Sequence, residues 1–253
     1  MTPRAQKMAS AALIVSVFVF WEAFCLIAGI SDLILPRPSR IIEAFLQYAP
    51  AIAPHAWQTL HTTLVGFSFG VLIGLFLGVL IGSSKLAYDT AYPLLVGISS
   101  IPKVAVVPIF VLWFGAGTVP AILTAMIICI FPIVVNVSTG IATVEPELED
   151  VMKSLKASKL EILWNVGLPR SLPYFFAALK VAITLSFVGS VIAETVASNK
   201  GVGNMMLIAS SQFNVPLVFS GLMVLAVMGI SLYAIFALLE GRMTGWATRK
   251  NNV

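Results

Sequence analysis

Glu147-Leu-Glu-Asp-Val-Met-Lys-Ser-Leu-Lys-Ala-Ser-Lys-Leu-Glu-Ile-Leu-Trp-Asn-Val-Gly-Leu-Pro169 is the longest strongly charged stretch of the chain, and long apolar runs flank it on both sides. From Glu145 to Arg170 there are five acidic and four basic residues, which are nine of the twenty-six charges in the chain. A polar segment between two membrane spans must lie in water. Its apolar residues recur at helical spacing, and Pro169 and Pro173 are expected to end it before the next span. The pattern favours a loop that docks a partner.

The rest of the composition indicates an integral membrane protein. The 253 residues are 59% hydrophobic and 10% charged, with a mean hydropathy of +0.99, whereas soluble domains carry about 25% charged residues. The basic residues behind the net charge of +4 are dispersed, which argues against a nucleic-acid partner. Cys25 and Cys129 both fall in apolar runs, so neither a disulfide nor a metal site is expected. We expect a single membrane domain over residues 1–253.

Six apolar runs are long enough to cross a hydrocarbon core of about 30 Å. Their expected bounds are residues 9–30, 60–83, 92–114, 119–140, 175–197 and 216–239. A short helix at the membrane interface is expected over residues 41–48, and a tight turn at Gly115-Ala-Gly117. The sequence therefore predicts an all-α polytopic membrane protein with six spans, with the charged loop between the fourth and the fifth.

Lysine and arginine are distributed unevenly between the two sides of these spans. If the N-terminus is cytoplasmic, ten lie on the cytoplasmic side and three on the outer side, with Lys103 and Lys180 within or near spans. The outer residues are Arg37, Arg40 and Lys200. The positive-inside rule then places both termini and the charged loop in the cytoplasm.

The second expected span carries glycine at every fourth position, at Gly66, Gly70, Gly74, Gly78 and Gly82. Such a column lets another helix approach closely, and we favour packing within one subunit over a contact between subunits. Gly66-Phe-Ser-Phe-Gly70 also matches the G-x-S-x-G pattern of hydrolases, which requires a strand, a turn and a histidine base. Here it lies in an apolar helix, and His61 is about 10 Å from Ser68 along the axis. No catalytic residue is therefore assigned.

The charged loop resembles the coupling loop of the permease subunits of binding-protein-dependent ABC importers, which has the pattern E-A-A-x3-G-x9-I-x-L-P. Asp150-Val-Met152 stands at E-A-A, Lys156 at the glycine, and Val166-Gly-Leu-Pro169 at I-x-L-P. The spacing is intact, although the acid is shorter, the alanines are larger and the glycine is replaced. The resemblance implies that a separate ATPase subunit contacts Asp150, Val151, Met152, Leu155, Lys156, Leu168 and Pro169.

Two further stretches resemble the nitrate, sulfonate and taurine branch of that family, so that the resemblance covers about residues 60–240. Pro102 to Gly115 follows its P-K-x-A-x-x-P-x-x-x-L-W-F-G segment, and Glu194 with Gly201-Val-Gly203 follows its acid and G-x-G stretch. A lysine in a span marks either a functional site or a side chain that reaches the headgroups, and Glu194 is either functional or an interfacial acid. Candidate residues of a translocation path are Lys103, Asn136, Ser138 and Glu194. Asn136 and Ser138 equally suit hydrogen bonding to neighbouring helices.

The resemblance implies a permease of the bacterial inner membrane that works as two copies, expected to be a homodimer, with two ATPase subunits and an extracytoplasmic solute-binding protein. Its expected solutes are sulfonate-like or nitrate-like anions, or alternatively thiamin-precursor pyrimidines. The chain has no G-x-x-x-x-G-K-[ST] and no H-E-x-x-H motif, so we expect neither ATP hydrolysis nor a cofactor or metal. A stand-alone secondary transporter and a membrane-embedded enzyme stay open, although neither matched internal repeats nor a catalytic constellation is found.

Overall fold

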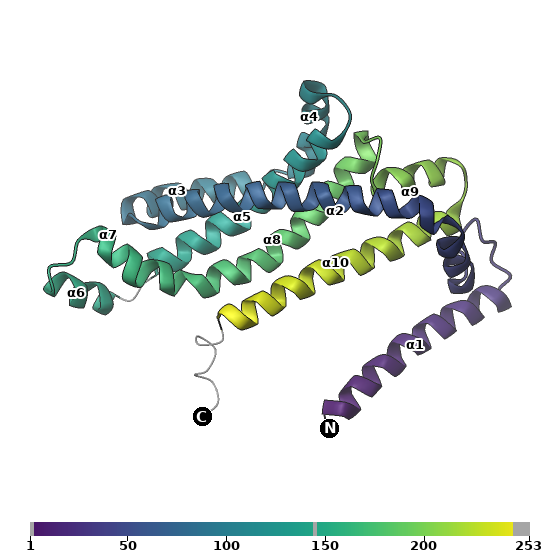
Figure 1. Ribbon diagram of the computed structural model, residues 1–253, viewed down its shortest axis with the longest axis horizontal. Coiled ribbons are helices and arrows are strands. Elements are labelled where there is room, and N and C mark those ends of the chain that lie inside the picture. The colour runs from purple at the N-terminus through teal and green to yellow at the C-terminus, as the bar shows by residue number, and fades with distance from the viewer. Residues whose placement is uncertain (1–2, 144–145, 245–253) are drawn as a thin grey trace.

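The computed structural model describes residues 3–143 and 146–244, and the described residues contain helices and no strands. Five helices are long and apolar enough to cross a membrane: α1 (Pro3–Ile27), α2 (Pro38–Gly82), α5 (Thr118–Ala142), α8 (Leu168–Ala197) and α10 (Val215–Met243). A sixth crossing is formed if α3 (Lys85–Ser99) and α4 (Val107–Phe114) act as one broken span (Figure 1). The predicted all-α polytopic fold is confirmed. Arg249 and Lys250, which were counted as cytoplasmic, lie outside the described residues.

The shorter elements all lie in the connections between these helices. They are the 3-10 turn η1 (Lys103–Val106), α6 (Pro146–Ser154), α7 (Lys159–Ile162), the π-helical turn η2 (Leu163–Gly167) and α9 (Val202–Ser211). The tight turn expected at 115–117 is confirmed, since Gly115 and Gly117 both have positive φ angles of 75° and 147°. The helix α9, between α8 and α10, was not expected.

The second span begins earlier than its hydropathy indicated. α2 runs without interruption for 45 residues. The predictions of a separate interfacial helix over 41–48 and of a span that starts near residue 60 were therefore wrong, because both segments belong to one helix. Pro50 and Pro54 lie inside α2, where each removes one backbone donor without ending the helix. Figure 1 shows the first turns of α2 at an angle to its long remainder, as expected of a helix bent by proline.

The third span, predicted as one apolar run over residues 92–114, is broken. α3 and the segment Lys103–Phe114 meet at an angle of 75°. Pro102 has no N–H to donate and disfavours helical backbone at Ile101, which explains why the helix stops there. The N–H groups of Ser100 and Ile101 close short turns onto Gly97 and Ile98 instead. As a result α4 projects from the rest of the bundle (Figure 1).

The glycine column of α2 lies against α5 of the same chain. Gly66 faces Ala125, Gly74 faces Ile133 and Gly82 faces Ile141, so each glycine is opposite the residue numbered 59 higher (133 − 74 = 59). A constant difference means that the two helices run in the same direction. A Cβ atom on Gly74 would lie 2.9 Å from the Cβ of Ile133, closer than side chains tolerate. The missing side chains therefore let the two backbones meet.

α8 lies antiparallel to α5, and α10 lies antiparallel to α8. For α5 and α8 the direction follows from two contacts, Gly140 with Ser171 and Gly189 with Ala125. For α8 and α10 it follows from Phe187 with Gly229 and from the ion pair between Lys180 and Glu240. The apolar core lies between α2, α5, α8 and α10, around Phe67, Ile133, Val137 and Ile183. The C-terminal ends of α2, α5 and α10 therefore lie at the same end of the bundle as the charged loop.

α1 is attached to this bundle near its C-terminal end. The Glu22 carboxylate accepts hydrogen bonds from the backbone N–H of Ser39 (3.0 Å) and from its hydroxyl (2.7 Å), at the first turn of α2. The ring of Trp21 lies 6.1 Å from that of Phe219 on α10. Toward its N-terminus α1 diverges from the bundle (Figure 1), and most of its apolar side chains are exposed, as expected of a helix that lipid surrounds.

Candidate functional site

The charged loop begins with α6, which ends in a Schellman motif. The N–H of Ala157 donates to the carbonyl of Met152 (3.0 Å), and the N–H of Lys156 donates to that of Lys153 (2.9 Å). Lys156 has a φ angle of 58°, the left-handed conformation that glycine usually supplies at this position. The residue that replaces the glycine of the importer pattern thus keeps the backbone conformation for which glycine is suited.

Several apolar side chains of the loop lie on its surface. Val151 is 57% exposed, Leu155 is 72% exposed and Trp164 is 64% exposed, whereas Met152 is partly buried. Of the other predicted coupling residues, Asp150, Lys156 and Pro169 are exposed and Leu168 is partly buried. Apolar groups gathered on a polar loop indicate a contact surface for another molecule.

The second half of the loop is continuous with α8. Ser158 immediately precedes α7. Its N–H (2.7 Å) and its hydroxyl (2.8 Å) both donate to the carboxylate of Glu161, as in a capping box. In η2 the N–H of Leu168 bonds to Leu163, five residues back. This wider turn precedes Pro169, which has no N–H to donate, and π turns of this kind are frequent at functional sites.

The sequence predicted that Pro169 and Pro173 end the loop before the fifth span. In the structure these prolines do not separate the two. α8 begins at Leu168, ahead of the predicted start at residue 175, with Pro169 in its first turn and Pro173 inside it. Proline is tolerated in a first turn because the N–H groups there have no helical partner. The loop and the span are thus joined by helical backbone alone.

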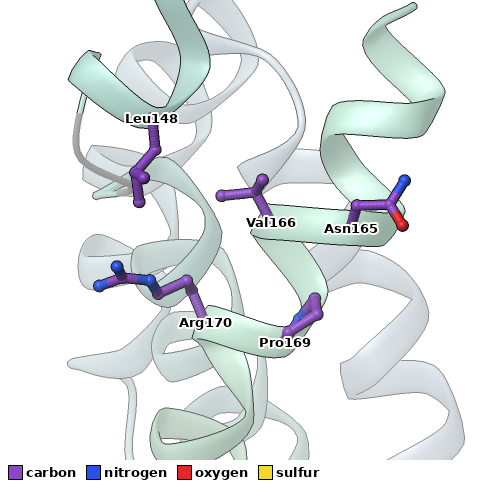
Figure 2. Close-up of a pocket in the computed structure, with 5 residues that line it drawn as sticks. All are labelled: Leu148, Asn165, Val166, Pro169 and Arg170. Carbon is purple, nitrogen blue, oxygen red and sulfur yellow. The ribbon is translucent and has the colours of Figure 1, made fainter. Parts of the chain in front are cut away.

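A pocket of about 260 Å³ lies between α6 and η2, lined by Leu148, Asn165, Val166, Pro169 and Arg170 (Figure 2). Figure 2 shows Val166 pointing across the pocket toward Leu148, whereas the amide of Asn165 turns outward. That amide donates to the carbonyl of Glu161 at 2.8 Å. The pocket is smaller than the roughly 300–1,000 Å³ of small-molecule sites, so a single side chain suits it better than a ligand.

At the opposite end of the bundle, Glu194 lies completely buried near the end of α8. Its carboxylate accepts a hydrogen bond from the hydroxyl of Thr59 on α2 (2.8 Å) and from the N–H of Gly203 in the first turn of α9 (3.3 Å). The hydroxyl of Thr62 lies 3.2 Å from its other oxygen. A Cβ atom on Gly201 would overlap the carboxyl group, so this loop needs glycine there.

Other polar groups extend this buried cluster. Thr59 also accepts a hydrogen bond from the N–H of Val202 (2.9 Å), and His55 Nδ1 accepts one from the N–H of Gly201 (3.1 Å). Ser190 lies 2.5 Å from the hydroxyl of Thr62. His55, Thr59, Thr62 and Ser190 were not predicted as site residues from the sequence. For the three residues on α2 the available signal was their spacing, since polar residues at i, i+4 and i+7 share one helix face; no such signal marked Ser190.

The other candidate path residues lie elsewhere. Lys103 is partly buried at the break after α3, where its ammonium donates to the carbonyl of Ser99 (3.0 Å) and lies 5.2 Å from the ring centre of Phe131. Phe131 is about 20 Å from the start of α5 and about 16 Å from its end. A cation is favoured at the C-terminal end of a helix by the helix dipole, so Lys103 also stabilises the broken end of α3.

The structure does not bring the four candidate path residues together. Asn136 is partly buried and donates to the carbonyl of Pro132 (2.8 Å), whereas Ser138 is fully buried beside Gly82. Glu194 contacts Thr59, which is about 34 Å from Gly82 along α2. The hydroxyl of Ser138 and the amide of Asn136 each donate to a carbonyl within α5.

The spans and the charged loop between the fourth and the fifth define a polytopic membrane protein with a partner-docking surface. Residues 70–245 match the family described as "Binding-protein-dependent transport system inner membrane component", and the chain belongs to this family. It is a permease subunit of an ABC importer, in the nitrate, sulfonate and taurine branch. As a member of this family it is a multi-pass membrane protein that works with an ATPase and a solute-binding protein.

Individual relatives support this assignment. The formylaminopyrimidine transport permease protein of Halalkalibacterium halodurans is 28% identical, over 92% of this chain and 93% of that one. The putative aliphatic sulfonates transport permease protein of Bacillus subtilis is 29% identical, over 91% of this chain and 84% of that one. Among solved structures, an inward-facing methionine ABC transporter matches 78% of this chain and 98% of that one with a TM-score of 0.69; at 19% identity it supports the fold alone.

Proposed function

We propose that two copies of this chain form the translocation path of an importer, and that two ATPase subunits dock on their charged loops. An extracytoplasmic binding protein delivers the solute, and both termini lie on the cytoplasmic side of the bacterial inner membrane. The observation that carries the proposal is the exposure of Val151 on α6 and of Leu155 directly after it, on a short helical segment between two spans. The excess of lysine and arginine at that end of the bundle supports its cytoplasmic position.

The continuity of the loop with α8 suggests how the coupling works. α7, η2 and α8 follow one another from Lys159 to Ala197 with no residue between them, so a displacement of the loop by the ATPase would be passed to the fifth span. Closure of the ATPase subunits on ATP would then open the path outward. The pocket between α6 and η2 belongs to the same docking surface, and we assign it to a side chain of the ATPase.

The proposed solute is a small sulfonate-like or nitrate-like anion. Lys103, at the break in the third span, is the cation best placed to attract one, since its ammonium lies level with the middle of α5. Asn136 and Ser138 are retained as further path candidates. Thiamin-precursor pyrimidines are the alternative, supported by the formylaminopyrimidine permease among the relatives. Because a binding protein delivers the solute, a binding screen on that partner is the direct test.

The coupling proposal is tested by Leu155→Glu. A carboxylate pressed into an apolar contact without a partner costs about 3–5 kcal/mol, so this variant should insert and fold but lose its ATPase subunit on purification, together with ATP-driven uptake. The matched control is Leu33→Glu, because Leu33 is 62% exposed in the connection between α1 and α2, at the other end of the molecule. That variant should keep the ATPase and the uptake of the wild-type chain.

Two results would count against the proposal. Normal uptake by Leu155→Glu with its ATPase still bound would show that α6 is not the coupling element. A wild-type chain that purifies without any ATPase, and that transports without ATP, would return the protein to the class of stand-alone secondary transporters.

A further inference from the structure

The buried cluster around Glu194 has a geometry that solute binding does not require. Its carboxyl group belongs to α8, yet its hydrogen-bond donors come from Thr59 and Thr62 on α2 and from Gly203 on α9. Among the described residues it has no surface open to solvent. We propose that Glu194 is a positioning residue for transport, which fixes α9 to the outer ends of α2 and α8 so that the three helices move as one body.

A carboxyl group suits this role because its two oxygens can each accept hydrogen bonds. Its oxygens lie within hydrogen-bond distance of Thr59, Thr62 and Gly203, and the N–H of Gly203 lies in the first turn of α9, where the helix dipole favours an acceptor oxygen. α9 has ten residues, which is long enough for this effect. The buried carboxyl group is thus held by hydrogen-bond donors that come from two other helices.

The segment before α9 is shaped to receive this carboxylate. Gly201 has a φ angle of 113°, a conformation that side chains disfavour. A Cβ atom on Gly203 would lie 2.5 Å from the carbonyl oxygen of Val191. Asn204 donates to the carbonyl of Ser198 at 2.6 Å and so closes the loop. The loop therefore fits closely against the end of α8.

Thr59 extends the attachment to α2 through two hydrogen bonds at one oxygen. It donates to Glu194 and accepts from the N–H of Val202. Beside it, the apolar side chains of Ile52 on α2 and of Val202 and Met205 on α9 form a buried cluster. Moving α9 away from α2 would separate both the polar and the apolar contacts, which explains why the three helices act together.

The first test is hydrogen exchange of the whole chain in lipid nanodiscs with its ATPase. Glu194→Gln and Thr59→Val should each make the amides of residues 201–205 exchange about tenfold faster, since each loses a buried hydrogen bond that holds α9. Thr124→Val is the matched control. Thr124 is equally buried, but its hydroxyl donates only to Pro120 within its own helix, so exchange at 201–205 should not change. Unchanged exchange in both Glu194→Gln and Thr59→Val would overturn the proposal.

The second test asks whether position is all that Glu194 provides. Ile52→Cys and Met205→Cys, in a chain with Cys25→Ala and Cys129→Ala, allow α2 and α9 to be joined by a short bifunctional methanethiosulfonate. Glu194→Gln should lower ATP-driven uptake by about tenfold, as expected for the loss of one buried hydrogen bond, and the cross-link should restore it. A chain that keeps Glu194 should transport normally when cross-linked.

A cross-link that fails to restore uptake would show that Glu194 acts on the solute or on the path. Uptake abolished by the cross-link in the chain with Glu194 would show that α9 must move relative to α2. Either result would overturn the proposal. The transport measurement rests on the proposed function, whereas the exchange measurement does not, so a parent chain without ATP-driven uptake would contradict the importer assignment and leave the exchange result to decide the role of Glu194.

Discussion

Lys156 replaces the glycine of the importer pattern with a long side chain, yet its backbone keeps the left-handed conformation that suits glycine. A side chain in the left-handed conformation places its Cβ too close to the following carbonyl, at a cost of roughly 1–2 kcal/mol. The Schellman hydrogen bonds of Ala157 and Lys156 hold that conformation despite the cost. The loop therefore keeps its shape without glycine, and it gains a positive charge at the end of α6, where the helix dipole favours one.

We therefore expect Lys156→Gly to stabilise the end of α6 by about 1 kcal/mol. Slower hydrogen exchange over residues 152–158 is the measurement. Lys153→Gly is the control and should have the opposite effect, because Lys153 has helical backbone in the last turn of α6, where glycine is less favourable than lysine. Faster exchange in Lys156→Gly than in the wild-type chain would contradict this account of the turn.

At the scale of elements, the pairing of α2 with α5 is specified by five glycines. Each one faces a side chain or a carbonyl of α5 at a separation that leaves no room for a methyl group. Gly97, on α3, is a helical glycine with nothing within 4 Å of a Cβ atom. The two kinds of position should respond oppositely to the same substitution.

Gly74→Ala should lower the stability of the subunit by about 1–3 kcal/mol, because the methyl group must push α5 away from α2. Gly97→Ala should raise it by about 1 kcal/mol through helix propensity. The measurement is the temperature at which half of each detergent-solubilised variant loses its monodisperse elution peak. An equal response to both substitutions would mean that the close approach at Gly74 contributes nothing.

Much of the element order was predictable from the sequence, because hydrophobic runs and glycine spacing are local signals. The break at Pro102 was not predicted, since the run over residues 92–114 is apolar on average and hydropathy alone does not register a missing backbone donor. The start of α2 was misplaced for the converse reason, because Pro50 and Pro54 look like helix ends although the helix passes through them. Thr59 was missed because its role depends on residues 135 and 143 positions away, at Glu194 and Val202.

For the whole molecule, the packing places the charged loop and the C-terminal end of α10 at one end of the bundle and α9 at the other. α8 runs between these two ends, from Leu168 to Ala197. The orientation of this bundle in the membrane follows from the distribution of lysine and arginine alone. It is therefore the property of the molecule that most needs a direct measurement.

Single cysteines provide that measurement in a Cys25→Ala, Cys129→Ala background. Cysteine at Lys156 should react with a membrane-impermeant thiol reagent only in inside-out vesicles, and cysteine at Lys200 only in right-side-out vesicles. Both native lysines lie outside the long apolar helices, so both positions are accessible to a water-soluble reagent. The reverse labelling pattern would invert the topology.

The pairing of α2 with α5 also implies a delay during biosynthesis, because α5 is made well after α2. Sixty residues separate Gly82 from Ala142 (142 − 82 = 60), and a ribosome that adds 5–20 residues per second needs about 3–12 s to make them. During that interval the glycine face of α2 is already in the membrane without its partner. In the nascent protein the glycine face of α2 therefore has no packing partner until α5 leaves the translocon. The contact between α2 and α5 can form only after the intervening helices α3 and α4 have been made.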